Sequence, residues 1–121
     1  MPVQDVTVVS VPVSDQDRAK EFYVGKLGFH LIRDDDTMPG IRWVQVAPKP
    51  GATALTLVTW FDTMPAGSLR GLVLGCDNLN AEYQRLHASG VDFDSPPQRQ
   101  PWATEAVIRD PDGNMIVLQQ A

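Results

Sequence analysis

The feature that most constrains the fold of this chain is an internal repeat. In each half, an aspartate at the end of an apolar stretch lies thirteen residues before a glycine: Asp15 before Gly28, and Asp77 before Gly90. The segment between aspartate and glycine carries apolar residues at helical spacing, with a capping side chain at its start. A chain that repeats one unit buries its apolar faces by packing the copies together.

Each half is predicted to fold as a βαβββ module, which gives the α+β class. The first helix is expected over residues 16–26, and the second follows a cap at Asp77 or Asn78 and ends at Gly90. Asp34-Asp35-Asp36 is expected to form a solvated turn. Alternating apolar residues predict strands over 5–13, 29–33, 41–47, 52–60, 69–76, 91–93, 102–109 and 115–119.

We expect one domain, 1–121, made of a first module over 1–62 and a second over 69–121. Residues 63–68, which include a proline and a glycine, form the predicted linker. One helix covers only one face of each four-stranded sheet. The other face is left concave, and the two concave mixed sheets are expected to enclose a cleft.

The composition narrows the possible partners. A net charge of −5 argues against nucleic acids and anionic membranes, which need a concentrated basic surface. No apolar run reaches the length of a membrane span, and no basic region precedes the first apolar stretch. The single cysteine, Cys76, fits a reducing cytoplasm, so we expect a cytoplasmic protein that binds small molecules or other proteins.

The chain resembles the vicinal oxygen chelate superfamily, which includes glyoxalase I, bleomycin-resistance proteins and extradiol dioxygenases. The resemblance covers essentially the whole chain and implies tandem βαβββ modules, but not one function. The motifs that carry it are Val13-Ser14-Asp15, Ala19, Phe22-Tyr23, Leu27-Gly28-Phe29, Gly90-Val91 and Asp110-Pro111-Asp112-Gly113-Asn114.

Enzymes of this superfamily usually hold a divalent metal with His, Glu or Gln from the first and last strand of each module. The corresponding positions here are Val8, Thr56 (or Leu55, if the register shifts by one), Gly71 and Val117. None supplies an imidazole, thiolate or carboxylate. His30 and His87 lie in different modules, away from the predicted cleft. We therefore expect no metal and no cofactor.

The expected cleft is mostly apolar with a few hydrogen-bonding groups, as is usual for a small-molecule pocket. Its predicted strand positions are Val8, Ser10, Thr56, Val58, Gly71, Val73, Val117 and Gln119. Trp43, Trp60 and Trp102 fall at strand ends, where they either rim the cleft and stack on a planar ligand or pack in the core or a dimer interface. Arg42 and Gln45 are further candidates for polar contacts.

Glu105 lies within an apolar strand and faces either the cleft or the solvent, where Arg109 is a possible partner. In the cleft it would be a candidate base or a partner for a cationic ligand group.

The first hypothesis is a metal-independent small-molecule-binding protein of the glyoxalase/bleomycin-resistance type, which holds a planar or hydrophobic ligand; sequestering a toxic antibiotic is one use. The alternative is a metal-free isomerase, lyase or cyclase with Glu105 as general base. A structural or regulatory dimer is a third possibility. The resemblance implies a homodimer. The sequence leaves open whether the two modules face each other within one chain or across the two chains of the dimer.

Overall fold

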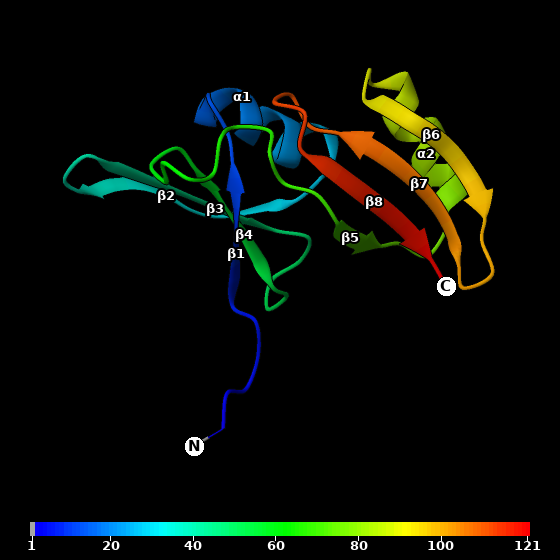
Figure 1. The fold of residues 1–121 in the computed structure, drawn as a ribbon, viewed down its shortest axis with the longest axis horizontal. Coiled ribbons are helices and arrows are strands. Elements are labelled where there is room, and N and C mark those ends of the chain that lie inside the picture. Colours follow the sequence, from blue (N-terminus) through cyan, green and yellow to red (C-terminus); the bar gives the residue numbers. More distant parts are fainter. Residues whose placement is uncertain (1) are drawn as a thin grey trace.

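Two four-stranded mixed sheets form the framework of the molecule (Figure 1). The structure is a computed structural model that describes residues 2–121. The first half forms β1 (Val8–Pro12), α1 (Gln16–Lys20), η1 (Glu21–Lys26, a π-helix), β2 (His30–Met38), β3 (Ile41–Ala47) and β4 (Ala54–Val58). The second half forms β5 (Leu72–Gly75), α2 (Leu79–Ala88), β6 (Asp92–Arg99), β7 (Thr104–Arg109) and β8 (Met115–Gln120). No helix within these residues is long and apolar enough to cross a membrane.

The internal repeat appears as identical strand order in the two sheets. Sheet A has the order β1-β4-β3-β2 and sheet B the order β5-β8-β7-β6. In each sheet the first strand of the module pairs in parallel with the last, and the other pairs are antiparallel. The predicted α+β class with two tandem βαβββ modules is confirmed.

The helices begin and end where the capping signals lie. The side chain of Asp15 accepts a hydrogen bond from the amide of Arg18, and that of Asn78 accepts one from Ala81, both at 3.1 Å. Gly28 and Gly90 follow the helices with φ of 83° and 87°, a conformation that favours glycine. The first helix widens from α1 into η1, where the amide of Leu27 bonds to the carbonyl of Phe22 five residues earlier.

The prediction of a turn at Asp34-Asp35-Asp36 is wrong, because these residues belong to β2. Asp34 pairs in register with Val44 and Asp35 with Trp43. Arg42 and Lys20 bond to the Asp34 carboxylate, with Nε–Oδ1 and Nζ–Oδ2 distances of 3.0 and 2.8 Å. These two cations lower the pKa of Asp34 to about 2, so the carboxylate is stable within the strand.

The second half contains a similar difference: a strand was predicted only over 91–93, but β6 runs to Arg99 and includes Pro96 and Pro97. β6 is an edge strand, and its pairing with β7 shifts register between Phe93 and Ser95 and again before Gln98. A proline is tolerated at an edge or a bulge, since no neighbouring strand needs its missing amide proton.

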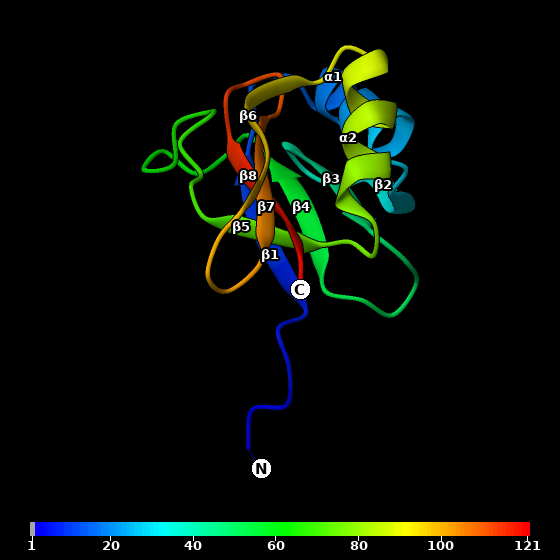
Figure 2. The same cartoon turned by 90° about the vertical axis from the view of Figure 1, so that its right-hand side faces the viewer.

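At the other end of the chain, the first strand is shorter than expected. β1 starts at Val8, and residues 2–7 form an exposed arm that projects from the body of the molecule (Figure 2).

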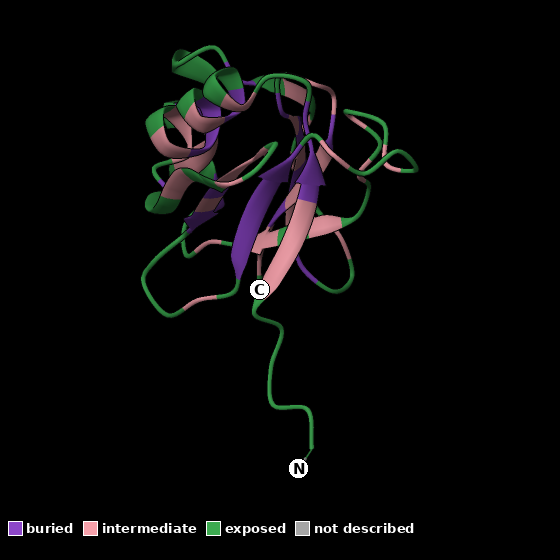
Figure 3. Ribbon diagram, turned by 90° about the vertical axis from the view of Figure 1, so that its left-hand side faces the viewer, coloured by how far each residue is buried: buried purple, intermediate pink, exposed green. Residues whose placement is uncertain are grey.

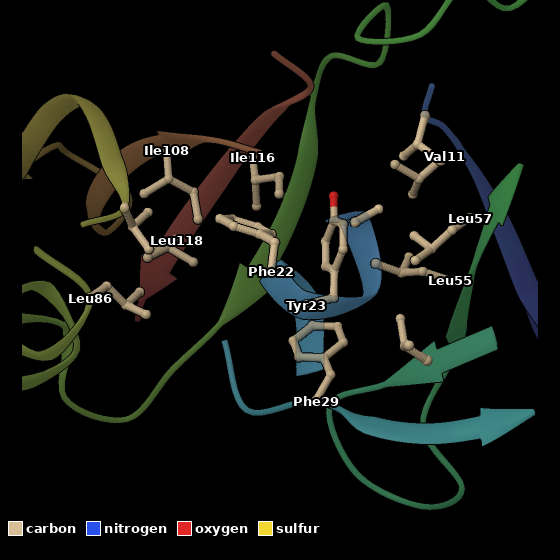
Figure 4. Packing of buried hydrophobic residues seen from close by; sticks show 14 of the residues in the cluster. Val11, Phe22, Tyr23, Phe29, Leu55, Leu57, Leu86, Ile108, Ile116 and Leu118 are labelled. Carbon is tan, nitrogen blue, oxygen red and sulfur yellow. The ribbon is translucent and has the colours of Figure 1, made fainter. Parts of the chain in front are cut away.

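A single apolar cluster joins the two modules through their helix-bearing faces. Burial is concentrated in the central strands and the inner sides of the helices (Figure 3). Phe22 and Tyr23 lie at its centre, with Phe22 on the side of Ile116 and Tyr23 on the side of Leu55 (Figure 4). Their rings meet edge to face at 5.0 Å between centroids.

A buried polar network crosses the same interface. The Tyr23 hydroxyl donates to Oδ2 of Asp110 at 2.8 Å, and the Asn114 side-chain amide donates to the same oxygen at 2.7 Å. The Asn114 amide also donates to the carbonyl of Pro12, and its Oδ1 accepts the amide of Leu69. The hairpin turn at 110–114 is thereby attached to both the helix and the first strand of the other module.

Removing the Tyr23 hydroxyl is expected to weaken the junction between modules. Tyr23→Phe keeps the ring but leaves the Asp110 carboxylate one donor short, which should lower the free energy of unfolding by about 1–3 kcal/mol. Urea denaturation measures this change. Tyr83→Phe is the matched control, because Tyr83 packs its ring on Phe93 outside this network, and its stability should stay within about 0.5 kcal/mol of the wild type.

The same variant should change the response to alkali. Burial, together with the adjacent Asp110 carboxylate, raises the pKa of Tyr23 far above its ordinary value. A raised folded pKa contributes stability that is complete below the unfolded pKa, about 10, and is lost as pH rises above it. The unfolding free energy of the wild type should therefore fall more steeply between about pH 10 and 12 than that of Tyr23→Phe; equal slopes would contradict this assignment.

Candidate functional site

The outward faces of the two sheets carry the candidate site residues. In sheet A, Val44, Val46, Leu55 and Leu57 point into the core, so the alternation of a strand turns Trp43, Gln45 and Thr56 to the opposite face. In sheet B, Ile108, Ile116 and Leu118 are in the core, which turns Glu105, Val117 and Gln119 outward. We call these surfaces the open face of sheet A and the open face of sheet B.

Aromatic side chains form a continuous ladder on the open face of sheet A. The rings of Trp43 and Trp60 are stacked, with centroids 6.1 Å apart and planes at 28°. Phe61 continues the ladder at 5.9 Å from Trp60, and the guanidinium of Arg33 lies 5.7 Å from the Trp43 centroid. The ladder offers an extended aromatic surface with a cation at one end.

A cavity of about 340 Å³ adjoins this ladder. Gln45 lines it, and its Oε1 accepts the indole Nε1–H of Trp43 at 2.9 Å, which connects the cavity to the ladder. Thr56, the register partner of Gln45 on β4, is only 1% exposed and does not line the cavity. The other lining residues come from the N-terminal arm and the first module: Asp5, Val6, Thr7, Ile32, Ala47, Gly51, Ala52, Thr53 and Ala54.

The open face of sheet B carries the Glu105 carboxylate next to aliphatic side chains. Glu105 is half-buried, and it accepts a hydrogen bond from Nε2 of Gln119 at 3.0 Å. Arg109, the alternative partner considered for Glu105, pairs instead with Asp94 at 2.7 Å. Val117 is half-buried and Val73 is 48% exposed, so this face presents apolar surface around the Glu105–Gln119 pair.

The structure thus divides the predicted site residues into two groups. Trp43, Gln45, Thr56 and Trp60 come together on sheet A, whereas Glu105, Val117 and Gln119 come together on sheet B. The cavity beside Gln45 is lined only by residues of the first half of the chain. Trp102 belongs to neither group: it lies before β7 and is 66% exposed.

Two contributors to the site escaped the sequence reasoning. Arg33 and Phe61 extend the aromatic ladder, but Arg33 lay at the end of a strand that was predicted too short, and Phe61 was assigned to a connecting segment. An apolar cavity of about 290 Å³ between the modules was also not foreseen. Its walls include Val9, Phe29, Leu55, Leu72 and Leu74, and no sequence pattern indicates which apolar residues leave such a gap.

The positions where the family resemblance implies metal ligands do not fit a metal. Val8 and Val117 are aliphatic, Gly71 has no side chain, and Thr56 offers only a hydroxyl. Zinc, nickel, iron and manganese require imidazole, thiolate or carboxylate donors. Within residues 2–121, no group of three or more His, Cys, Asp or Glu side chains is arranged to hold a metal ion.

Comparison with known proteins gives the family. The model of the Glyoxalase/Bleomycin resistance protein/Dioxygenase superfamily matches residues 5–118. The chain belongs to this superfamily. The uncharacterized protein YetH of Bacillus subtilis (strain 168) is 31% identical over 121 residues, which cover 98% of this chain and 99% of YetH.

Solved structures agree with this assignment. TnmS3, described as an antibiotic binding protein from Streptomyces sp. CB03234, is 49% identical with a TM-score of 0.94, over 99% of this chain and 98% of TnmS3. A superfamily member from Sphaerobacter thermophilus DSM 20745 is 34% identical with a TM-score of 0.90, over 98% of each chain.

The donor set leads to a prediction about metal content. After expression in medium supplemented with zinc, nickel and manganese, the purified protein should carry far less than one equivalent of any of them, because the ligand positions offer no suitable donors. Elemental analysis measures this content. One tightly bound divalent ion per chain would contradict the prediction.

Proposed function

We propose that the protein is a metal-independent small-molecule-binding protein of the glyoxalase/bleomycin-resistance type, which holds a planar or hydrophobic ligand. The observation that carries the proposal is the ladder of Arg33, Trp43, Trp60 and Phe61 beside the 340 Å³ cavity. Flat aromatic surfaces next to a cavity of this size favour a flat ligand. The likeness to TnmS3, an antibiotic binding protein, supports antibiotic sequestration as a use.

We further propose that the binding cleft is completed by a homodimer. The open face of sheet A supplies aromatic rings and hydrogen-bonding groups, and that of sheet B supplies apolar surface with Glu105 and Gln119. Within one chain the two modules are joined by their helix-bearing faces, so their open faces do not meet. In the proposed dimer, the open face of sheet B of one copy packs against the open face of sheet A of the other. Exposed Val73 and half-buried Val117 would then be covered.

A metal-free enzyme is the second candidate function. The Glu105 carboxylate lies on the open face of sheet B with Gln119 as its hydrogen-bond partner, which is a possible arrangement for a general base. An isomerase, lyase or cyclase would use it to remove a proton, whereas the binding protein would use it only for contact.

Two flat tricyclic probes test the binding function: 9-fluorenone and carbazole, which have the same ring shape. Both should bind the wild type in equilibrium dialysis. Trp60→Ala should weaken both about three- to tenfold, because the variant removes the central ring of the ladder. Tyr83→Leu, which removes an aromatic ring from the cluster beside α2, is the control and should leave both affinities unchanged.

Mass spectrometry of the dialysed compounds separates the two functions. The wild type and Glu105→Gln should both return each probe unchanged. A mass change that the wild type produces and Glu105→Gln abolishes would overturn the binding function in favour of the enzyme. Failure of the wild type to bind either probe would overturn the planar-ligand proposal itself.

The dimer is tested by placing a charge on the open face of sheet B. The wild type should have twice the mass of one chain by light scattering, and Val117→Lys should have the mass of one chain, because a buried lysine without a partner is costly at an interface. Ala88→Lys adds the same charge on exposed helix α2 and should remain dimeric. A wild-type monomer at micromolar concentration would contradict the proposed assembly.

A further inference from the structure

Two adjoining cavities lie between the modules, against the core cluster. The larger, of about 290 Å³, is lined by Val9 of β1 and Leu55 of β4 among others, and the smaller, of about 160 Å³, by Leu86 of α2 and Leu118 of β8 among others. Four residues line both cavities: Phe29, Pro48, Leu74 and Gly75. In Figure 4, Phe29 lies between Leu55 on one side and Leu86 on the other. We call the two cavities together the junction cavity.

The junction cavity leaves two core leucines incompletely covered. Leu72 and Leu74 of β5 are in register with Ile116 and Leu118 of β8, which are 0% and 5% exposed. Both leucines pack against the same core, but they are only half-buried. β1 and β5 are edge strands of separate sheets, so within residues 2–121 no strand pairing closes the gap between them. An apolar ligand in this gap would remove the exposed leucine surface from water, which is favourable.

The chemistry of the walls narrows the class of ligand. Among the described residues that line the junction cavity, Glu82 is the one with a charged side chain, and its carboxylate is paired with Arg85 at 2.7 Å. The Cys76 thiol is half-buried, and burial raises its pKa, so the thiol is neutral at pH 7. Phe29 is the one aromatic residue in these walls. The site therefore offers aliphatic contact, without the stacked rings that a planar ligand needs.

We propose that the junction cavity binds the tail of an unbranched aliphatic chain, such as that of a fatty alcohol. An apolar cavity of about 150 Å³ holds benzene, so the larger cavity alone has room for a chain of roughly ten carbons. Pro48 and Thr53 line the larger cavity and are exposed, so the polar head of the chain stays in water beside them.

This site goes beyond the proposed function, because it is separate from the aromatic ladder. Leu55 points from sheet A into the core and lines the larger cavity, whereas Trp43 is on the opposite face of the same sheet. The two sites differ in chemistry as well, since one offers stacked rings and the other aliphatic walls. A planar ligand and an alkyl chain should therefore bind at the same time.

The first test compares chains by isothermal titration calorimetry. 1-Decanol should bind the wild type about tenfold more tightly than 1-octanol, because each methylene removed from water strengthens binding about three- to fourfold. Decane-1,10-diol has the same chain with a hydroxyl at both ends. It should bind at least tenfold more weakly than 1-decanol, because one hydroxyl would lose its water among apolar walls.

The second test fills the cavity. Leu74 lines both parts, so Leu74→Trp should weaken 1-decanol at least tenfold and keep or raise Tm, because the new ring occupies the space of the chain. Val9→Phe fills the larger cavity from the opposite module, and it decides the question if Leu74→Trp does not fold. Leu31→Trp makes the same change on exposed β2, outside both cavities, and should leave the affinity unchanged.

The thiol of Cys76 reports where the chain lies. It is the one cysteine of the sequence, and it lines the smaller cavity. Saturating 1-decanol should slow its reaction with 5,5′-dithiobis(2-nitrobenzoate) at pH 8 at least threefold in the wild type, because the chain covers the sulfur. The same concentration should not slow the reaction in Leu74→Trp.

The outcomes separate this inference from the proposed function. If 1-decanol and the diol bind equally, or if the filled variants bind 1-decanol as the wild type does, the junction cavity is only a packing gap and the inference is wrong. If 1-decanol displaces 9-fluorenone, the chain occupies the planar-ligand site and a separate site is ruled out. If 1-decanol binds as expected and 9-fluorenone does not bind at all, the inference stands and the planar-ligand function fails.

Discussion

The buried network of Tyr23, Asp110 and Asn114 is the interaction on which the arrangement of the molecule depends. Tyr23 of the first module bonds to Asp110 of the second, and Asn114 of the second module bonds both to Asp110 and to Pro12 of the first. The Asp110 carboxylate also accepts backbone amides of Asp112 and Asn114 through Oδ1. A carboxylate with this many donors is stable away from water, and it fixes the distance between the π-helix η1 and the 110–114 turn.

Because this network joins the helix-bearing faces, the opposite faces of both sheets remain available. Phe22 and Tyr23 serve both modules at once, so the core is complete without the residues of the open faces. Most polar groups in the junction are paired, but Oδ2 of Asp112 in the 110–114 turn, like Oγ1 of Thr56 on the open face of sheet A, has no hydrogen-bond partner within residues 2–121. Unpaired buried oxygens therefore occur both at the junction and on the open face, and the network is held by Asp110 and Asn114.

The sequence predicts the fold well because its signals are local. Asp15 and Asn78 cap helices, and Gly28 and Gly90 end them, through backbone geometry that few other residues allow. The extent of β2 was not predictable in this way, since the cations that bind Asp34 come from other elements, Lys20 from α1 and Arg42 from β3. For the candidate site, the strand position of Trp43 was predicted, whereas Trp60 lies beyond the end of β4 at Val58, and the stacking of the two rings was not foreseen.

The residues at the implied metal-ligand positions bear directly on the proposed metal-independent function. Of Val8, Thr56, Gly71 and Val117, only Thr56 keeps a polar side-chain atom. A metal ion would hold a ligand oxygen by its charge, whereas a hydroxyl and an amide each contribute about 0.5–1.5 kcal/mol of net hydrogen bonding. Two such donors do little to stabilise a developing negative charge, so the proposed function relies instead on stacking of a flat ligand on Trp43 and Trp60. The proposal is therefore one of recognition by shape and hydrogen bonding rather than of activation of the ligand.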